Sequence, residues 1–294
     1  MLEHGSDLEK PQRVVVLGAG GFVGSEAVPA MERADISVRG LARADIDLME
    51  PEAAARLSDI LEPGNSLVVI SANAPCRDVP MLVENVKMMG AVCAAVADAE
   101  LAHLVYVSSD AVYTDSPDPL TEDSATMPSS MHGMMHVVRE AMLRETAGDI
   151  PFAILRPSLL YGVRDPHNGY GPNRFRRQAA DEGRIVLFGG GEEQRDHVLI
   201  DDLGELICRV VAHRSRGILN VATGSVMSFH DIAGIVAAQF DADIEIETTP
   251  RSGPMPHNGY RPFDASATYA AFPDFAYTKL EEGLVRVHGE SVGG

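Results

Sequence analysis

The chain alternates short apolar runs with amphipathic stretches through its first half. Each apolar run is the length of a strand, and each following stretch repeats its apolar positions at helical spacing. The strands are predicted at 13–17, 36–42, 66–71, 103–109 and 152–161, and the helices at 22–31, 51–61, 81–99 and 131–145. Strands that alternate with helices predict a parallel sheet with helices on both faces. We therefore expect a doubly wound α/β fold.

The second half is less regular and richer in Gly, Pro and Arg. Its predicted elements are a loop at 164–174, helices at 174–182, 203–213 and from Phe229, and strands at 184–188, 197–200 and 218–222. We predict a flexible tail over 1–10, a first domain over 11–165, and a small α/β lobe over 166–294 that is partly interleaved with it. The lobe would cover the carboxyl ends of the parallel strands, where a cleft forms.

Composition narrows the classes of function. The 294 residues include 24 Lys plus Arg and 43 Asp plus Glu, which gives a net charge of −19. This charge argues against nucleic acid or an anionic membrane as the main partner, because both require a basic face. The three cysteines form no metal-binding pattern and fit a reducing cytoplasm. The first ten residues do not resemble a signal peptide, and no apolar run approaches the roughly 18 residues that span a bilayer.

A glycine-rich turn connects the first strand to the first helix. Gly18, Gly21 and Gly24 are spaced three residues apart, with Gly20, Phe22 and Val23 among them. Glycine lets a chain turn sharply and approach a pyrophosphate without a Cβ in the way, and the helix that follows offers free N–H groups. In this strand–turn–helix context the pattern predicts an adenine dinucleotide site.

The residues after the second strand are expected to meet the adenosine of that dinucleotide. Arg43 is suited to pair with a 2′-phosphate, which favours NADP, whereas Asp45 is suited to a 2′-hydroxyl, which favours NAD. We prefer Arg43 and NADP, and Arg39 is a further candidate. Asp47 and Leu48 lie where an adenine edge would be held.

Four segments in this order resemble the extended short-chain dehydrogenase/reductase family. They are GAGGFVG, VYVSSDAVY, RPSLLYG and RDHVLIDDL, and the segment ADIDLMEPEAAARL adds similarity to the dTDP-4-dehydrorhamnose reductase group. The resemblance covers about 12–285. It implies a Rossmann domain, a substrate lobe, and a nucleotide-sugar epimerase, dehydratase or reductase of homodimeric assembly.

The resemblance also assigns roles to individual residues. By position in the motifs, these are Gly18, Gly21 and Gly24 for the dinucleotide, Ala72 and Asn73 for the cofactor wall, Asn85 for helix structure, Ser109 for the catalytic Ser/Thr, Arg195 for substrate phosphates, and Asp201 and Asp202 for structure. These assignments depend on the family resemblance and not on spacing.

The sequence departs from the family at its acid/base motif. The family has Tyr-x-x-x-Lys, and here His132 and His136 occupy the two positions. One reading is that His132 moves the proton and His136 faces the nicotinamide ribose, because residues four apart share a helix face and imidazole titrates near neutrality. A second is that Tyr113 or Tyr161 supplies the missing phenol. A third is that the chain binds dinucleotide without turnover, as a regulatory or assembly module.

The loop over 164–177 gathers basic, amide and aromatic residues. Here Asn173 is a candidate for a sugar hydroxyl, Arg174, Arg176 or Arg177 for a diphosphate, and Tyr170 for stacking on a base. The alternative is that these arginines pair with nearby carboxylates. Arg195 is the preferred substrate residue, ahead of Arg261. The sequence thus predicts an NAD(P)-dependent nucleotide-sugar epimerase or reductase, with a non-catalytic NAD(P)-binding member of the family as the alternative, and no metal.

Overall fold

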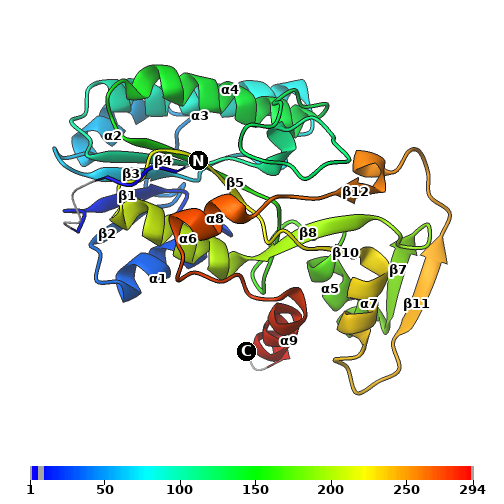
Figure 1. Cartoon of the computed structure of the whole chain (residues 1–294). Helices are drawn as coiled ribbons and strands as arrows, with labels where there is room; N and C mark the ends of the chain where they lie inside the picture. The colour runs from blue at the N-terminus through cyan, green and yellow to red at the C-terminus, as the bar shows by residue number, and fades with distance from the viewer. Residues whose placement is uncertain (1, 6–9, 293–294) are drawn as a thin grey trace.

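The computed structural model describes residues 2–5 and 10–292, and a six-stranded sheet forms its centre (Figure 1). All neighbouring strands in this sheet are parallel. In spatial order they are β2 (Val38–Leu41), β1 (Val14–Leu17), β3 (Ser66–Val69), β4 (His103–Val107), β5 (Phe152–Pro157) and β9 (Gly217–Val221). The predicted doubly wound α/β fold is confirmed.

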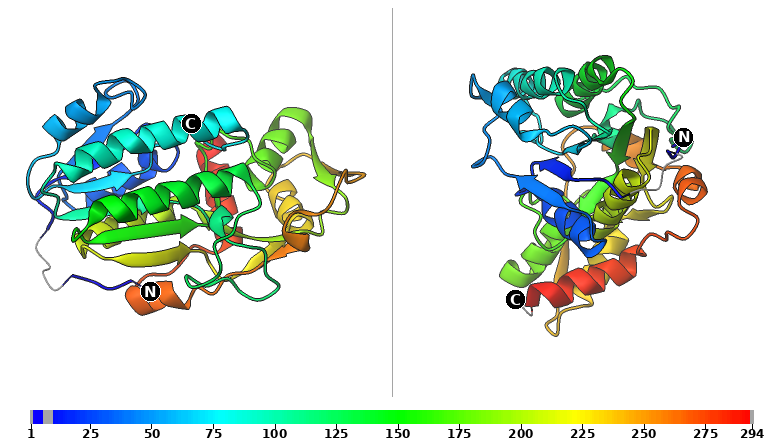
Figure 2. Two further views of the ribbon diagram at one scale, coloured as in Figure 1. Left: turned by 90° about the horizontal axis from the view of Figure 1, so that it is seen from above. Right: turned by 90° about the vertical axis from the view of Figure 1, so that its left-hand side faces the viewer.

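Helices cover both faces of this sheet (Figures 1 and 2). One face carries α2 (Ala53–Ile60), α3 (Val79–Ala97) and α4 (Met131–Ala147), and the other carries α1 (Gly24–Arg33) and α6 (Ile200–Ala212). Strand β1 shows why its run is apolar throughout. Val14 and Val16 belong to one core, and Val15 and Leu17 belong to the other. Alternate side chains thus leave the strand on opposite faces, and both faces are buried.

The order of the strands reverses between β1 and β3. The chain winds outward from β1 to β2 on one side and from β3 onward on the other. In open α/β sheets a crevice opens outside the carboxyl ends of the strands at such a reversal. The glycine turn after Leu17 and the segment after Val69 therefore meet at one edge of the sheet.

The second lobe has smaller sheets and its own core. Strand β8 (Gln194–Leu199) lies between β10 (Val226–Ser228) and β12 (Tyr260–Arg261) and also pairs with β6 (Leu159–Tyr161), while β7 (Arg184–Phe188) pairs with β11 (Glu245–Thr249). The helices are α5 (Pro172–Glu182), α7 (Phe229–Ala237), α8 (Ser266–Ala271) and α9 (Leu280–Val292), with short turns η1 (Asp110–Val112) and η2 (Pro256–Gly259). Phe175, Phe229 and Ile232 are among its buried residues.

The predicted strand at 152–161 is in fact two strands. β5 belongs to the large sheet, and β6 joins β8 in the second lobe. The break is at Ser158, which is buried, donates its hydroxyl to Asp196 at 2.8 Å and gives its backbone N–H to Val221. The sequence places Arg, Pro and Ser between the two apolar halves of this segment, but it does not show these tertiary hydrogen bonds. The strand expected at 197–200 similarly ends at Leu199, because Ile200 begins α6.

Helix α3 corrects the statement that no segment approaches the length of a membrane span. By length and composition alone it qualifies, with 19 residues and a mean hydropathy of 1.4. In the fold, however, Met89 and Val92 are completely buried against the sheet. One face of this helix therefore covers the core.

The predicted tail at 1–10 lies partly outside the described residues. Within the described part, Leu2 is buried and Glu3 pairs with Arg216 at 2.8 Å.

Strand β9 returns the chain from the second lobe to the central sheet, so the two parts of the chain are interleaved.

Candidate active site

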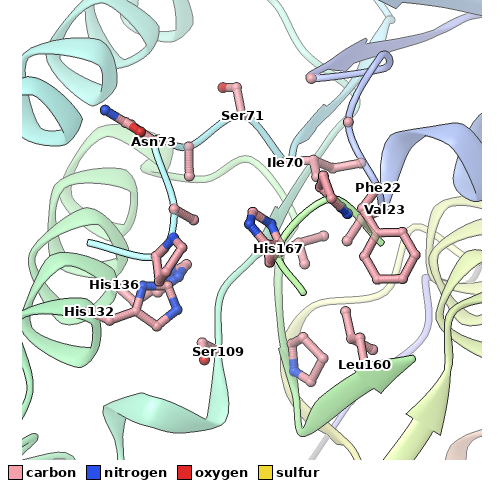
Figure 3. Close-up of a pocket in the computed structure, with 18 of the residues that line it drawn as sticks. Phe22, Val23, Ile70, Ser71, Asn73, Ser109, His132, His136, Leu160 and His167 are labelled. Atoms are coloured by element: carbon pink, nitrogen blue, oxygen red, sulfur yellow. The ribbon is translucent and has the colours of Figure 1, made fainter. Parts of the chain in front are cut away.

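A cleft of about 1270 Å³ runs along the carboxyl ends of β1 to β5 and is closed on its far side by the second lobe. The glycine turn, the segments after β2, β3 and β4, the start of α4 and the loop after β6 all contribute to its wall. Figure 3 shows the part where α4 faces the glycine turn. Side chains from widely separated segments of the sequence thus meet in one continuous space.

The glycine turn has the shape that the sequence predicts. Gly18 has a φ of 93°, and a Cβ there would lie 2.8 Å from the backbone nitrogen of Ser71. Gly18, Gly20, Gly21, Phe22 and Val23 line the cleft. Helix α1 begins at Gly24, directly after this lining, so the positive end of its dipole lies behind the turn.

Gly24 does not line the cleft. It is the first residue of α1 and packs behind the turn, where a Cβ would collide with the carbonyl oxygen of Gly18. Its part in dinucleotide binding is therefore indirect: it lets the helix approach the strand closely enough to place the turn.

The segment after β2 forms the far end of the cleft. Arg43, Asp47 and Leu48 line it, and the Arg43 guanidinium pairs with Asp47 at 3.1 Å while remaining largely exposed. The backbone N–H of Met49 holds the pKa of Asp47 below its usual value, assisted by Arg43. Asp45 instead accepts the backbone N–H of Ala42 at 2.8 Å and is not part of the lining. Of the two ribose candidates, Arg43 is the one at the cleft.

Ala72 and Asn73 form the cleft wall after β3. The backbone of Asn73 is held twice by Asn85 on α3, since its N–H donates to Oδ1 and its carbonyl accepts from Nδ2, each at 2.9 Å. The Asn73 side chain donates to Glu84 at 2.9 Å. Because Asn85 is completely buried, it fixes the path of this wall rather than meeting a ligand.

Ser109 lies at the carboxyl end of β4, where it caps η1. Its Oγ accepts the backbone N–H of Ala111 at 3.1 Å and remains at the cleft surface. The neighbouring Asp110 is buried, lines the cleft, and accepts Nε of Arg261 at 2.8 Å. The Ser109 hydroxyl donates only a long hydrogen bond, 3.5 Å, to Asp110 Oδ1, so it can turn to a ligand in the cleft.

His132 and His136 both reach the cleft from the first turns of α4, as the shared helix face predicts (Figure 3). Their ring centroids are 4.7 Å apart, edge to face. The helix approaches η1 closely because Gly133 has no Cβ, which would collide with the carbonyl oxygen of Ala111. This contact brings His132 to the same end of the cleft as Ser109.

Burial keeps the two imidazoles neutral at pH 7. It is the main cause that lowers the pKa of His132, against which Asp110 acts. Burial, His132 and Arg139 together place the pKa of His136 well below its ordinary value of 6.5. His132 Nδ1 receives the backbone N–H of Cys76 at 3.4 Å, a long contact that leaves its tautomer open. His136 Nδ1 instead makes a 2.7 Å hydrogen bond with the buried hydroxyl of Tyr106.

The two tyrosines considered as substitutes for the missing phenol lie away from the cleft. Tyr113 is buried and donates its hydroxyl to Asn220 at 2.6 Å. Tyr161 is completely buried against Gly283 of α9. Burial raises the pKa of both hydroxyls. Neither is placed to exchange a proton with a ligand in the cleft.

The second lobe contributes Asn173 and Arg195 to the lining. Asn173 Oδ1 accepts the backbone N–H of Gly162 at 3.0 Å, and Arg195, nearly buried, pairs with Glu193 at 3.2 Å. Arg174 does not line the cleft, and its guanidinium lies over the ring of Phe188 at 5.7 Å. Arg177 binds Asp165 and Asn168, so the reading in which loop arginines pair locally holds for that residue. Arg261 is completely buried on Asp110 and Asp115.

Several lining residues were missed from the sequence. They are His167 in the loop after β6, His197 on β8, and His257 in η2. Figure 3 shows His167 facing the space in front of Ser109 and His132. His167 lies within the loop that the sequence marks as unusual, which was a usable signal. His197 follows the predicted Arg195 by two residues on β8, which was a second signal, whereas His257 has none, because only the tertiary fold brings it to the cleft.

The residues at this cleft fit an adenine dinucleotide. The turn at Gly18 leaves no room for a Cβ, helix α1 begins directly after the lining residues Phe22 and Val23, and the cleft continues past Arg43 at one end and to His136 at the other. The fold and the cleft together define a dinucleotide-binding α/β protein of the Rossmann type.

The chain belongs to the NAD dependent epimerase/dehydratase family, whose model matches residues 14–222. It is 29% identical over 254 residues to an ADP-L-glycero-D-manno-heptose-6-epimerase of Thiobacillus denitrificans, covering 76% of each chain. The UDP-glucose 4-epimerase of Thermus thermophilus in complex with NAD has the same fold, with a TM-score of 0.84 at 20% identity over 96% of this chain and 100% of that one. A UDP-glucuronic acid 4-epimerase of Bacillus cereus, in complex with UDP-glucuronic acid and NAD, gives a TM-score of 0.82 at 18% identity over 96% and 99%.

Proposed function

We propose that this chain is an NAD(P)-dependent epimerase or reductase that acts at a sugar carbon of a nucleotide sugar. The observation that carries the proposal is the meeting of Ser109, His132 and His136 in one cleft, between the turn that fits a dinucleotide and the lobe that bears Arg195. Membership of the family and the substrates named for its relatives support the same class of reaction.

The side chains have separate roles in this proposal. A bound dinucleotide would supply the hydride acceptor and donor. Ser109 Oγ donates a hydrogen bond to the reacting sugar oxygen. His132, neutral at pH 7, accepts the proton of the sugar hydroxyl during oxidation and returns it during reduction. Arg195 holds the phosphates of the nucleotide, Asn173 binds a sugar hydroxyl, and Arg174, which does not line the cleft, has no place in the site.

We further propose that NADP is preferred over NAD. The support is that Arg43 lines the adenosine end of the cleft, whereas the carboxylate of Asp45 is occupied by the backbone of Ala42. The guanidinium of Arg43 is largely exposed, so it is free to turn from Asp47 towards a 2′-phosphate.

A homodimer through α3 and α4 is our proposal for the assembly. Only 28% of the apolar window of α3 is buried within the chain, and Val79 and Val83 on it are exposed. Met134 and Val138 are exposed on the neighbouring α4. A second copy placed on these helices would cover this apolar surface.

The three free cysteines support our proposal that the protein works in the cytoplasm.

Turnover separates this proposal from the non-catalytic alternative. The purified protein is incubated with NAD or NADP and with UDP-, ADP-, GDP- and dTDP-sugars, and absorbance at the nicotinamide band and the sugar products are followed. We expect conversion of at least one sugar, and about 100-fold or greater loss in His132→Ala. His230→Ala, which removes an exposed imidazole, is the control. Full activity in His132→Ala overturns the assigned role, and dinucleotide binding without any conversion favours the non-catalytic reading.

A further inference from the structure

A buried tyrosine hydroxyl forms a hydrogen bond with one nitrogen of the His136 ring. Tyr106 lies in the middle of β4 with no exposed surface, and its hydroxyl is 2.7 Å from Nδ1 of His136. His136 also lines the cleft, so Nε2, the ring nitrogen that Tyr106 does not contact, is the one available to a ligand there. The position that carries a flexible lysine in the family therefore carries an imidazole ring whose orientation is fixed by its hydrogen bond with Tyr106.

A buried cation stands beside this pair. Arg139, one turn further along α4, has no exposed surface, and its guanidinium lies over the Tyr106 ring at 5.3 Å. It donates to the carbonyl oxygen of Ser71 at 2.5 Å and to Asn85 Oδ1 at 3.4 Å. In the part of the chain that the structure describes, no carboxylate forms an ion pair with it. Its positive charge is therefore not cancelled locally.

These contacts determine the protonation state of the His136 ring. The ionisable or charged groups that face it are Tyr106 from β4, and His132 and Arg139 from α4, and none of them is an anion near neutral pH. An uncompensated cation opposes a second positive charge on the ring. Burial raises the pKa of Tyr106 to about 12, so its hydroxyl keeps its proton.

The hydrogen-bond pattern then selects the tautomer. His136 Nδ1 is the only hydrogen-bond partner of the Tyr106 hydroxyl among the described residues. A buried hydroxyl proton without an acceptor is costly, so this hydroxyl donates to Nδ1. In a neutral imidazole the single proton must then be on Nε2.

We propose that Tyr106 and Arg139 are positioning residues that keep His136 neutral, with its Nε2–H turned into the cleft. The site thus offers its ligand a fixed hydrogen-bond donor where the family offers a positive charge. This inference rests on the proposed function for the identity of the acceptor, a ribose hydroxyl of the dinucleotide. Its physical content, the protonation and tautomer of one ring, is independent of turnover.

The test is nitrogen NMR of protein labelled with ¹⁵N-histidine, with the His136 signals assigned through His136→Gln. We expect the Nε2–H tautomer in the wild type and no titration between about pH 5.5 and pH 8. Tyr106→Phe is expected to mix the tautomers, and Arg139→Met to move the titration to higher pH. Tyr161→Phe is the matched control, because it removes the hydroxyl of another completely buried tyrosine that does not reach the cleft.

Each outcome supports or overturns the inference. Titration of wild-type His136 near pH 6.5, an Nδ1–H tautomer, or an unchanged spectrum in Tyr106→Phe overturns it. If Arg139→Met fails to fold, the nearly isosteric Tyr106→Phe decides alone. Calorimetry adds a second readout: Tyr106→Phe should weaken dinucleotide binding about 3- to 10-fold, as expected for a misdirected hydrogen bond, and Tyr161→Phe should not. Failure of the proposed function would show as absent turnover with the tautomer unchanged.

Discussion

Gly18 and Gly24, at the first turn, are each required because a Cβ would collide with a specific backbone atom. Gly18 needs a positive φ and contacts the backbone of Ser71, whereas Gly24 has ordinary helical geometry and is required only for close approach. The distinction matters because Gly18 lines the cleft and Gly24 does not. A change at Gly24 therefore tests whether packing behind the turn controls binding in front of it.

Gly24→Ala is expected to lower the free energy of unfolding by about 1–3 kcal/mol, because the added methyl group meets the Gly18 carbonyl oxygen. Dinucleotide binding should weaken as the turn is displaced. Chemical denaturation and calorimetry measure the two effects. Gly90→Ala is the control: a Cβ at this position in α3 meets no heavy atom within 4 Å, so this change should stabilise by roughly 0.5–1 kcal/mol. Equal effects of the two substitutions would contradict the packing argument.

Arg43→Ala tests the cofactor preference at the same scale. Loss of the guanidinium should reduce the affinity for NADP about tenfold or more and leave that for NAD within about twofold, since only NADP offers a 2′-phosphate. The rise in melting temperature with each dinucleotide is the measurement. Arg39→Ala is the control, because it removes an exposed arginine of β2 that does not line the cleft. An equal loss for both cofactors in Arg43→Ala would contradict the preference.

At the scale of elements, one buried ion pair joins α4 to the sheet. Glu140 on α4 accepts a hydrogen bond from Nη2 of Arg156 on β5 at 2.7 Å and another from the hydroxyl of Ser108 at 2.6 Å. Both charged side chains are nearly fully buried. The helix that carries His132 and His136 is thereby fixed against the end of β4 that carries Ser109. This connection places the candidate catalytic groups relative to one another.

Glu140→Gln should cost about 3–5 kcal/mol of unfolding free energy, because it leaves the Arg156 charge buried without its counter-ion. The measurement is the shift of the denaturation midpoint at unchanged slope. Glu205→Gln is the comparison, since it breaks an exposed pair with Arg209 at 2.8 Å that should contribute about 1 kcal/mol or less. Similar losses of unfolding free energy in the two variants would show that the buried ion pair contributes no more to stability than the exposed one.

Elements with a strong local pattern were predictable, and those defined by tertiary contacts were not. The run Val14–Leu17 is apolar because both of its faces are buried, and the first five strands and their helices were therefore located from the sequence. The break at Ser158 escaped prediction because a distant carboxylate, Asp196, causes it. The short β10, β11 and β12 are mostly half-exposed, so their sequences show no apolar run.

At the scale of the whole molecule, the sheet edge explains which site residues could be predicted. The predicted Gly18, Ala72 and Ser109 follow β1, β3 and β4, whose carboxyl ends necessarily converge. His167 and His257 come from the second lobe, whose position over that edge the sequence does not give. Tyr106 was missed for another reason: it lies within an apolar strand, and nothing in the sequence shows that its hydroxyl reaches α4.

Burial of histidines also gives the whole fold a pH dependence. His103 and His197 are nearly or completely buried, and their burial lowers their pKa to about 4 and about 3, while His132 and His136 shift in the same direction. In the unfolded chain these side chains titrate near 6.5. Below that pH the unfolded state binds more protons than the folded state, so the free energy of unfolding falls as the pH decreases. Asp196 and Asp202, whose pKa burial raises, act in the opposite sense, because the folded state takes up their protons before the pH has fallen to their ordinary 3.8.

Comparison of the wild type with a histidine variant separates the two opposing effects, and His103 is the residue to vary because it does not line the cleft. Its Nε2 contacts the carbonyl oxygen of Ser215 at 2.6 Å, a hydrogen bond that a glutamine amide can replace without titrating. In His103→Gln the loss of unfolding free energy on going from pH 7 to pH 4 should be smaller than in the wild type by about 3 kcal/mol. His230→Gln, at an exposed position, should leave the loss unchanged. Denaturation curves at several pH values measure both, and parallel curves for the wild type and His103→Gln would show that His103 accepts a proton in the folded state as easily as in the unfolded one.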